Sequence, residues 1–268
     1  MRSLQSHELK RELTDFLSKK GAFKVRIADP QKGFEKVVNG CHPFDIMKDC
    51  RSVIVFAFNI GLDYYLSMDY QNHNIRLGHL YRDWTHLQLI GFLRTKGYDA
   101  MEVPRGMKDE DNKIAHMSFK LAAHEAGIGV FGRPGIIITP EYGPRVNLGV
   151  VLTDAKLEPD GHVTGFNPCN PCTVCVENCP AKAIREDLLP PSGFRRDRCV
   201  GFFDWIRKET KDKDMTCGYC YDKCPAGKLV RETVRIKRWN KLTNTDANLR
   251  KQLVNSYLRG RRQTAGTV

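Results

Sequence analysis

Seven of the ten cysteines in this 268-residue chain fall into two short patterns and an eighth lies upstream of the second; this feature restricts the possible folds most strongly. The first pattern is C-x2-C-x2-C-x3-C-P, in the stretch "NPCNPCTVCVENCPAKAI" of residues 167–184. The second is C-x2-C-x3-C-P in residues 217–225, with Cys199 upstream of it. Loops with thiols at such fixed offsets are expected to fold around a group that thiolates bind.

The first spacing is typical of loops that bind iron-sulfur clusters, in which the fourth cysteine of a run serves the other cluster. Cysteines two residues apart place three thiolates around one cube, while backbone N–H groups point at its sulfurs. We therefore predict two [4Fe-4S] clusters. The predicted ligands are Cys169, Cys172, Cys175 and Cys224 for the first cluster, and Cys179, Cys199, Cys217 and Cys220 for the second.

Zinc and disulfides are the alternatives for these thiols. Structural zinc sites use C-x2-C pairs separated by a longer insert, and three cysteines at two-residue spacing crowd one tetrahedral ion. Disulfides need an oxidising compartment, and the N-terminal "MRSLQSHELKREL" has no apolar segment for export. The two remaining cysteines, Cys41 and Cys50, are expected to be small core residues or free thiols.

Charge is concentrated at the C-terminal end. The formal net charge is +12, and residues 226–268 carry eleven Lys or Arg against two acidic residues. Such a tail contacts RNA phosphates, an acidic electron donor, or only water. The chain has no apolar run of membrane-spanning length, so we expect a cytoplasmic protein without a membrane span.

The N-terminal part alternates between helical and extended patterns. Residues 6–21 place Leu9, Leu13, Phe16 and Leu17 on one helical face, with Ser6 as the expected cap. Strands are expected at residues 22–29, 52–60 and 98–103. Between residues 77 and 96 a helical stripe is predicted to face the core; it consists of Leu80, Tyr81, Trp84, Leu87 and Ile90. Interleaved helices and strands indicate an α/β layer of about 160 residues.

Gly127, Gly129 and Gly132 spell G-x-G-x-x-G, a pattern known from dinucleotide-binding folds. That motif requires a strand before the glycines and a helix after them, so that the phosphates meet a helix N-terminus. Here the preceding "MSFKLAAHEA" is helical and the following "GIIIT" is extended. These glycines are therefore expected to allow a sharp turn or a close approach to something flat.

The block "LAAHEAGIGVFGRPGIIITPEYGPRVNLGVVLTDAKLEPD", followed by the cysteine motifs, resembles the shared core of the corrinoid-dependent reductases, namely epoxyqueuosine reductases and reductive dehalogenases. The resemblance implies an α/β domain related to nitroreductases (residues 1–165) that binds base-off cobalamin. A ferredoxin-like α+β domain with both clusters (166–230) and a basic tail (231–268) follow. The residues implied to lie against the corrin, besides "TPEYGPR", are Gly127, Gly129, Gly132, Arg133 and Gly135.

The proton donor departs from the family pattern. Epoxyqueuosine reductases carry an acidic residue fourteen positions before the glycine of their AGLG segment, where this chain has Lys113. The candidate catalytic residues are therefore Asp111, which lies near that position beside Asp109 and Glu110, and Tyr142, by similarity to a tyrosine donor of dehalogenases.

The function that the resemblance implies is an iron-sulfur oxidoreductase that passes electrons to a bound corrinoid. The chemistry would resemble epoxyqueuosine reduction or dehalogenation, on a small molecule or a tRNA. Such a reductase needs a low-potential electron donor such as ferredoxin or flavodoxin. Two alternatives remain: a [4Fe-4S] electron carrier or reductive activator without its own substrate, and an RNA-associated redox protein in which the tail dominates.

Overall fold

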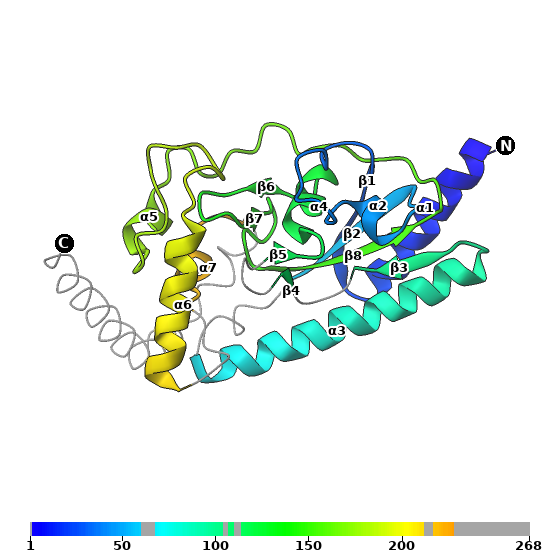
Figure 1. The fold of residues 1–268 in the computed structure, drawn as a ribbon. Helices are drawn as coiled ribbons and strands as arrows, with labels where there is room; N and C mark the ends of the chain where they lie inside the picture. The colour runs from blue at the N-terminus through cyan, green and yellow to red at the C-terminus, as the bar shows by residue number, and fades with distance from the viewer. Residues whose placement is uncertain (1, 60–67, 104–106, 110–113, 212–216, 228–268) are drawn as a thin grey trace, which may run out of the picture. The chain divides into compact units, whose positions relative to one another are not determined.

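The computed structural model describes residues 2–59, 68–103, 107–109, 114–211 and 217–227 (Figure 1). The chain divides into two compact units. Unit 1 comprises residues 1–60, 78–130 and 146–166, and unit 2 comprises residues 61–77, 131–145 and 167–268. Each unit is thus assembled from segments that lie far apart in the sequence. The basic tail, 231–268, lies outside the described residues.

A four-stranded antiparallel sheet forms the centre of unit 1, in the order β1-β2-β8-β3. The strands are β1 (Ala22–Ala28), β2 (Ser52–Asn59), β3 (Ala100–Glu102) and β8 (Val146–Thr153). The three strands predicted from β-branched and aromatic runs are confirmed as β1, β2 and β3. Phe56 pairs with Gly149, where an added Cβ would lie 2.2 Å from the Phe56 ring, so that glycine makes room for the ring.

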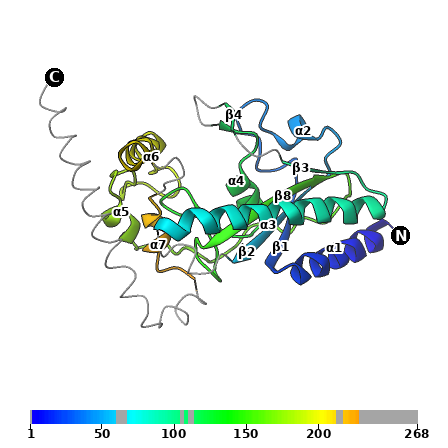
Figure 2. The ribbon, with the colours of Figure 1, turned by 90° about the horizontal axis from the view of Figure 1, so that it is seen from below.

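Helices cover both faces of this sheet. Leu9, Leu13 and Leu17 of α1 (Arg2–Lys19) pack with β2 and with the C-terminal part of α3 (Met68–Thr95) in one apolar cluster. Figure 2 shows α1 beside that part of α3, and α4 (Phe119–Glu125) on the other side of the sheet. The buried face predicted for α1 is confirmed, but the helix begins at Arg2. Ser6 therefore lies inside it, where its hydroxyl donates to the Lys156 carbonyl.

The predicted core stripe of α3 is wrong for four of its five members. Only Ile90 is buried; the exposed members are Leu80, Tyr81, Trp84 and Leu87. The buried face is turned by about one residue and consists of Arg82, Thr85, His86, Leu89 and Leu93. Its polar groups find partners on β8: the Arg82 guanidinium donates to Asn147, and Nε2 of His86 accepts from the Val150 N–H. Satisfied hydrogen bonds thus allow the polar side of the helix to face the sheet.

The short elements of unit 1 surround this layer. They are α2 (Pro43–Ile46), β4 (Met107–Asp109) and β5 (Ile114–Ala115). The helix α4 begins at Phe119 after the cap Ser118, whose hydroxyl accepts from the Leu121 N–H. His116 therefore lies before the helix, whereas His124 lies within it.

Unit 2 consists of short elements joined by long loops. They are β7 (Ile137–Ile138), which pairs with β6 (Val130–Phe131), and the helices α5 (Val174–Asn178), α6 (Arg196–Thr210) and α7 (Tyr219–Asp222). A small apolar cluster of Ala181, Ala183, Phe202 and Ile206 forms its core. Because unit 2 has so few regular elements, its loops must be held together by interactions other than those of helices and strands.

No helix in the described part of the chain combines the length and the apolar character that crossing a membrane requires.

Candidate metal centre

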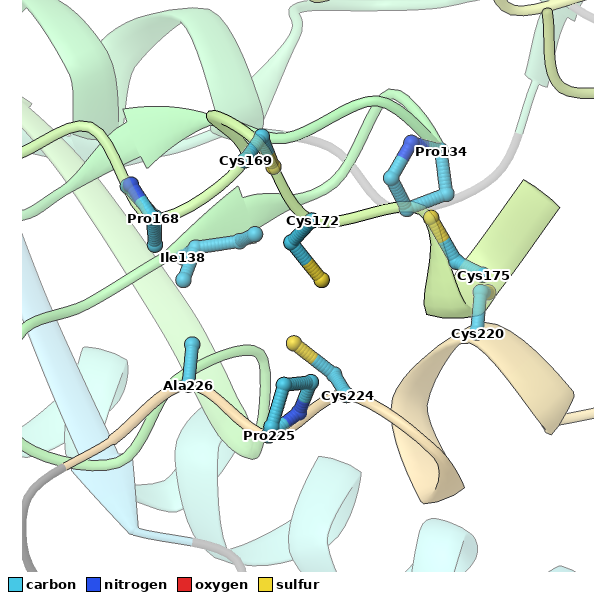
Figure 3. A pocket seen from close by; sticks show the side chains of 10 residues that line it. All are labelled: Pro134, Ile138, Pro168, Cys169, Cys172, Cys175, Cys220, Cys224, Pro225 and Ala226. Atoms are coloured by element: carbon cyan, nitrogen blue, oxygen red, sulfur yellow. The ribbon is translucent and has the colours of Figure 1, made fainter. Parts of the chain in front are cut away.

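All eight motif cysteines belong to unit 2, and five of them line one hollow. The hollow is partly open to solvent. Figure 3 shows the thiols of Cys172 and Cys224 directed toward each other across it. Its thiol-bearing lining is Cys169, Cys172, Cys175, Cys220 and Cys224, and its apolar lining is Pro134, Ile138, Pro168, Pro225 and Ala226.

The electrostatic neighbours of Cys175 are the other three members of the predicted first ligand set. Burial raises the pKa of the Cys175 thiol to about 12, and repulsion from nearby thiolates adds to the rise. Those neighbours are Cys169, Cys224 and Cys172. Burial also raises the pKa of Cys169 and of Cys224. These four thiols therefore form one interacting group.

The second group gathers around Cys220 on α7. Burial raises the pKa of Cys220 well above its ordinary value, and the contributing thiolates are Cys217, Cys199, Cys175 and Cys179, in falling order. Three of these four belong to the predicted second set. Cys179, Cys199 and Cys217 also pack against the apolar core of unit 2. Cys199, the member with no close sequence neighbour, is thus brought to the others by helix α6.

Two arginines hold the loops that carry the first set. The Nε of Arg133 donates to the carbonyls of Cys169 and Cys172, both at 3.2 Å, and its Nη1 donates to Glu186 at 2.7 Å and to Leu188 at 3.2 Å. Arg145 is 4% exposed, and its Nη2 donates to the Cys224 carbonyl at 2.9 Å. Both guanidinium groups oppose the rise in pKa of the cysteine that they adjoin, Cys169 and Cys224 respectively.

Two glycines of the G-x-G-x-x-G block, Gly127 and Gly132, and the following Gly135 have close neighbours within the protein. Gly127 has φ +77°, and an added Cβ would lie 2.1 Å from the Gly161 carbonyl oxygen in unit 1. In unit 2, an added Cβ would lie 2.4 Å from Ile138 at Gly132 and 2.8 Å from the Phe194 ring at Gly135. These three glycines therefore serve close packing of the chain against itself. As predicted, a helix precedes the block and extended chain follows it.

The structure describes only some of the predicted acid–base residues. Asp111 and the neighbouring Lys113 and Glu110 lie outside the described residues, whereas Asp109 is half-buried in β4. Tyr142 is half-buried in a turn of unit 2, where its backbone N–H donates to the Thr139 hydroxyl at 3.1 Å.

The two cysteines outside the motifs are buried thiols of unit 1. Cys41 is 5% exposed and its thiol donates to the Ala115 carbonyl, while Cys50 is 4% exposed and its thiol donates to the Ser52 carbonyl. Burial raises the pKa of Cys50 to about 11.

Sequence reasoning missed two features of this centre. Arg133 was assigned to the corrin, and Arg145 was included only as the last residue of "TPEYGPR". Arginine contacts of this kind could have been expected in general terms. A buried loop that carries thiolates needs nearby cations, and its backbone carbonyls need hydrogen-bond donors. The sequence does not show which arginine reaches which loop.

Comparison with known proteins identifies relatives of two kinds, although no protein-family model matches the chain. The epoxyqueuosine reductase of Bacillus subtilis is 31% identical over 148 residues, which is 52% of this chain and 35% of that protein. The tetrachloroethene reductive dehalogenase of Sulfurospirillum multivorans is 33% identical over 147 residues, 51% of this chain and 27% of that protein. The matched stretches thus cover about a third of these relatives.

Solved structures of both kinds share the fold. The epoxyqueuosine reductase of Bacillus subtilis has a TM-score of 0.56 at 20% identity, over 83% of this chain and 66% of that one. A reductive dehalogenase structure described for B12-dependent dehalogenation has a TM-score of 0.59 at 20% identity, over 88% of this chain and 34% of that one. In sequence the chain is therefore similar to epoxyqueuosine reductases and reductive dehalogenases, and solved structures of both kinds share its mixed α/β fold.

Proposed function

We propose that the protein is an iron-sulfur oxidoreductase whose unit 2 holds two [4Fe-4S] clusters and conducts electrons to a reducible group. The observation that carries this proposal is the gathering of Cys169, Cys172, Cys175 and Cys224 around one hollow, with a second thiol group around Cys220. The kinship with two kinds of reductase supports the redox assignment.

The spacing of the thiols favours a cluster over a single zinc ion. Zinc binds thiolates at about 2.3 Å, so that four sulfurs around one tetrahedral ion lie roughly 3.8 Å apart. Among the residues described, no three cysteine thiols lie within 4.8 Å of one another. A cube of four irons, in which each thiolate binds a different iron, accommodates the wider separation.

The surroundings of the first group suit an anionic cluster. The apolar lining of the hollow raises the cost of placing negative charge there. The guanidinium groups of Arg133 and Arg145 offset part of this cost, because each adjoins a ligand loop and donates to its carbonyls. Their charge also favours the reduced, more negative state of a cluster, so we expect both arginines to raise its reduction potential.

Cluster assembly has to remove protons from these thiols. The raised pKa of Cys175, about 12, means that its thiol is neutral at pH 7 without a metal. Iron binding must therefore displace the proton, and the affinity for iron rises with pH. Arg133 and Arg145 assist this step, because they stabilise the thiolate form of Cys169 and Cys224.

We further propose, on kinship, that the protein passes these electrons to a bound cobalamin. A reduced corrinoid supplies a cobalt centre capable of reductive cleavage of C–O or C–halogen bonds. Support comes from the relatives, one of which is described for B12-dependent dehalogenation and another in complex with an epoxyqueuosine-modified tRNA stem loop. A small molecule or a tRNA is therefore the proposed substrate, and a ferredoxin or flavodoxin the proposed donor. The packing of Gly127, Gly132 and Gly135 against the chain itself adds no support for a corrin contact.

A second candidate function is an electron carrier or reductive activator without its own substrate. One observation favours it: Gly127, Gly132 and Gly135 have protein neighbours at the position of a Cβ.

Anaerobic spectroscopy separates the two candidates. Protein with reconstituted clusters is reduced with dithionite, checked by electron paramagnetic resonance, and titrated with cobalamin while the absorbance spectrum is recorded. The reductase requires stoichiometric conversion of cobalamin to its base-off form. Reducible clusters without any such conversion at a large excess of cobalamin would leave the electron carrier, and the absence of reducible clusters would refute both.

A further inference from the structure

Outside the cysteine motifs, three ligand-type side chains of unit 1 come together. They are His124 and Glu125 at the C-terminal end of α4, and His162 in the segment that follows β8. One ligand atom from each lies within 4.8 Å of the other two. Among the described residues, no other group of three His, Cys, Asp or Glu side chains comes this close together. None of the three had been assigned to a metal by its sequence spacing.

The fold brings His162 to the helix through two attachments. The Asp160 carboxylate accepts from the Lys10 ammonium at 2.9 Å, from Arg26 at 3.1 Å and from the Ile27 N–H at 2.8 Å. Next to it, the carbonyl of Gly161 occupies the space that a side chain at Gly127 would need. The segment is therefore fixed on both the strand β1 and the end of α4, and the position of His162 follows from these contacts.

The geometry of the three side chains is compact. The Nε2 of His162 lies 2.8 Å from Oε2 of Glu125, and the rings of His124 and His162 stack with centroids 4.9 Å apart at 19°. The Glu125 side chain is 13% exposed, and an added Cβ at Gly33 would lie 2.0 Å from its Oε2, so that backbone closes over the carboxylate. The carboxylate is thereby held in place beside both imidazoles.

A backbone carbonyl completes the arrangement expected around a metal-binding imidazole. The Nδ1 of His124 lies 3.4 Å from the Gly129 oxygen. Metal-binding histidines commonly donate one ring N–H to such an acceptor, which directs the other nitrogen to the ion. In the tautomer that donates from Nδ1, Nε2 of His124 is the metal-binding nitrogen.

The geometry points to a binding site for a divalent transition-metal ion, with zinc as the preferred occupant, on His124, Glu125 and His162. Two imidazoles and one carboxylate are a known ligand set for zinc, with water in the fourth position. The bound ion would fasten residues 154–166 to α4. This site is independent of the clusters and of the proposed function.

The test is a zinc titration of anaerobic, cluster-loaded protein at pH 7.5. Clusters occupy the motif thiols so that these do not compete for zinc, and the iron content is measured to verify that the clusters are loaded. Wild type is expected to bind one zinc ion per chain. His162→Asn and Glu125→Gln are each expected to weaken this binding at least tenfold. Because the His162 side chain is 53% exposed, its replacement leaves the core intact.

The matched control is His7→Asn. His7 forms an exposed pair with Glu158 at 3.1 Å and belongs to no group of three, so its loss should leave zinc affinity unchanged. Zinc should also raise the thermal unfolding midpoint of wild type and His7→Asn, but not of His162→Asn. The proposal is overturned if cluster-loaded wild type binds no stoichiometric zinc, or if His162→Asn binds it as tightly as wild type.

Discussion

Replacing Arg133 with methionine tests whether hydrogen bonds hold the first cysteine loop in its cluster-binding form. The guanidinium makes four hydrogen bonds, two from Nε to the Cys169 and Cys172 carbonyls and two from Nη1 to the Glu186 and Leu188 carbonyls. Methionine has a similar apolar length but no donor. The change therefore removes the donors while it keeps most of the packing.

The expected magnitude follows from the exposure of these carbonyls. The bond that Nε shares between two partly buried carbonyls contributes about 1.5 kcal/mol, because the donor is charged. The two bonds to exposed carbonyls contribute about 0.5 kcal/mol each, since water replaces the donor. The total is about 2.5 kcal/mol, and each 1.4 kcal/mol is a factor of ten, so local opening of the loop should become roughly 60-fold more frequent.

The assay is anaerobic iron release to a chromophoric chelator. In Arg133→Met, about half of the iron, that of the first cluster, should leave roughly 60-fold faster, while the other half leaves at the wild-type rate. Arg185→Met is the control, because Arg185 forms an exposed ion pair with Asp187 and such pairs contribute little. Iron release from Arg133→Met at the wild-type rate would refute the reasoning. If cobalamin binding alone weakened, Arg133 would be the corrin contact that the family resemblance implies.

Three further predictions concern single residues. Cys172→Ala should lower bound iron from about eight to about four per chain, and loss of all iron would show that the clusters do not assemble separately. Gly127→Ala should lower the free energy of unfolding, measured with denaturant, by about 2 kcal/mol more than Gly97→Ala does. Both glycines have a positive φ, but only Gly127 faces a carbonyl, so equal losses would contradict this prediction. Burial raises the pKa of Cys50 from 9.0 to about 11, so the unfolded state releases its proton first and stability falls as pH rises from about 9 to 11, by on the order of 3 kcal/mol. Thermal unfolding at pH 8 and 10.5 should show this loss in wild type but less of it in Cys50→Ala, and parallel losses would refute the assignment.

Helices and strands of unit 1 could be predicted where one physical signal dominates. The leucines of α1 recur with helical spacing and all face the same apolar cluster, and β2 is a β-branched and aromatic run that is buried on both faces. For α3 the predicted core face was wrong, because periodicity identifies an apolar stripe on a helix but does not show on which side of the helix the sheet lies. There Arg82 and His86 face the sheet, since Asn147 and Val150 offer them hydrogen bonds.

The thiol groups were predictable because ligand spacing is a local property of the sequence. In runs of this spacing the fourth cysteine serves the other cluster, and this rule predicts two ligand sets from the sequence alone. The contacts of Arg133 and the approach of His162 to Glu125 depend on segments 36 and 37 residues apart and were not predictable in the same way. Spacing in the sequence does not report such contacts, because they arise only when the loops pack.

The central claim is that eight cysteines hold two cubes of four irons. Its most direct test is a count of iron, acid-labile sulfide and zinc in anaerobically purified and reconstituted protein, with the protein concentration determined by amino-acid analysis. About eight irons and eight sulfides per chain are expected, and half of each should be lost when one ligand set is disrupted. Tightly bound zinc in the cysteine motifs with no sulfide would contradict it.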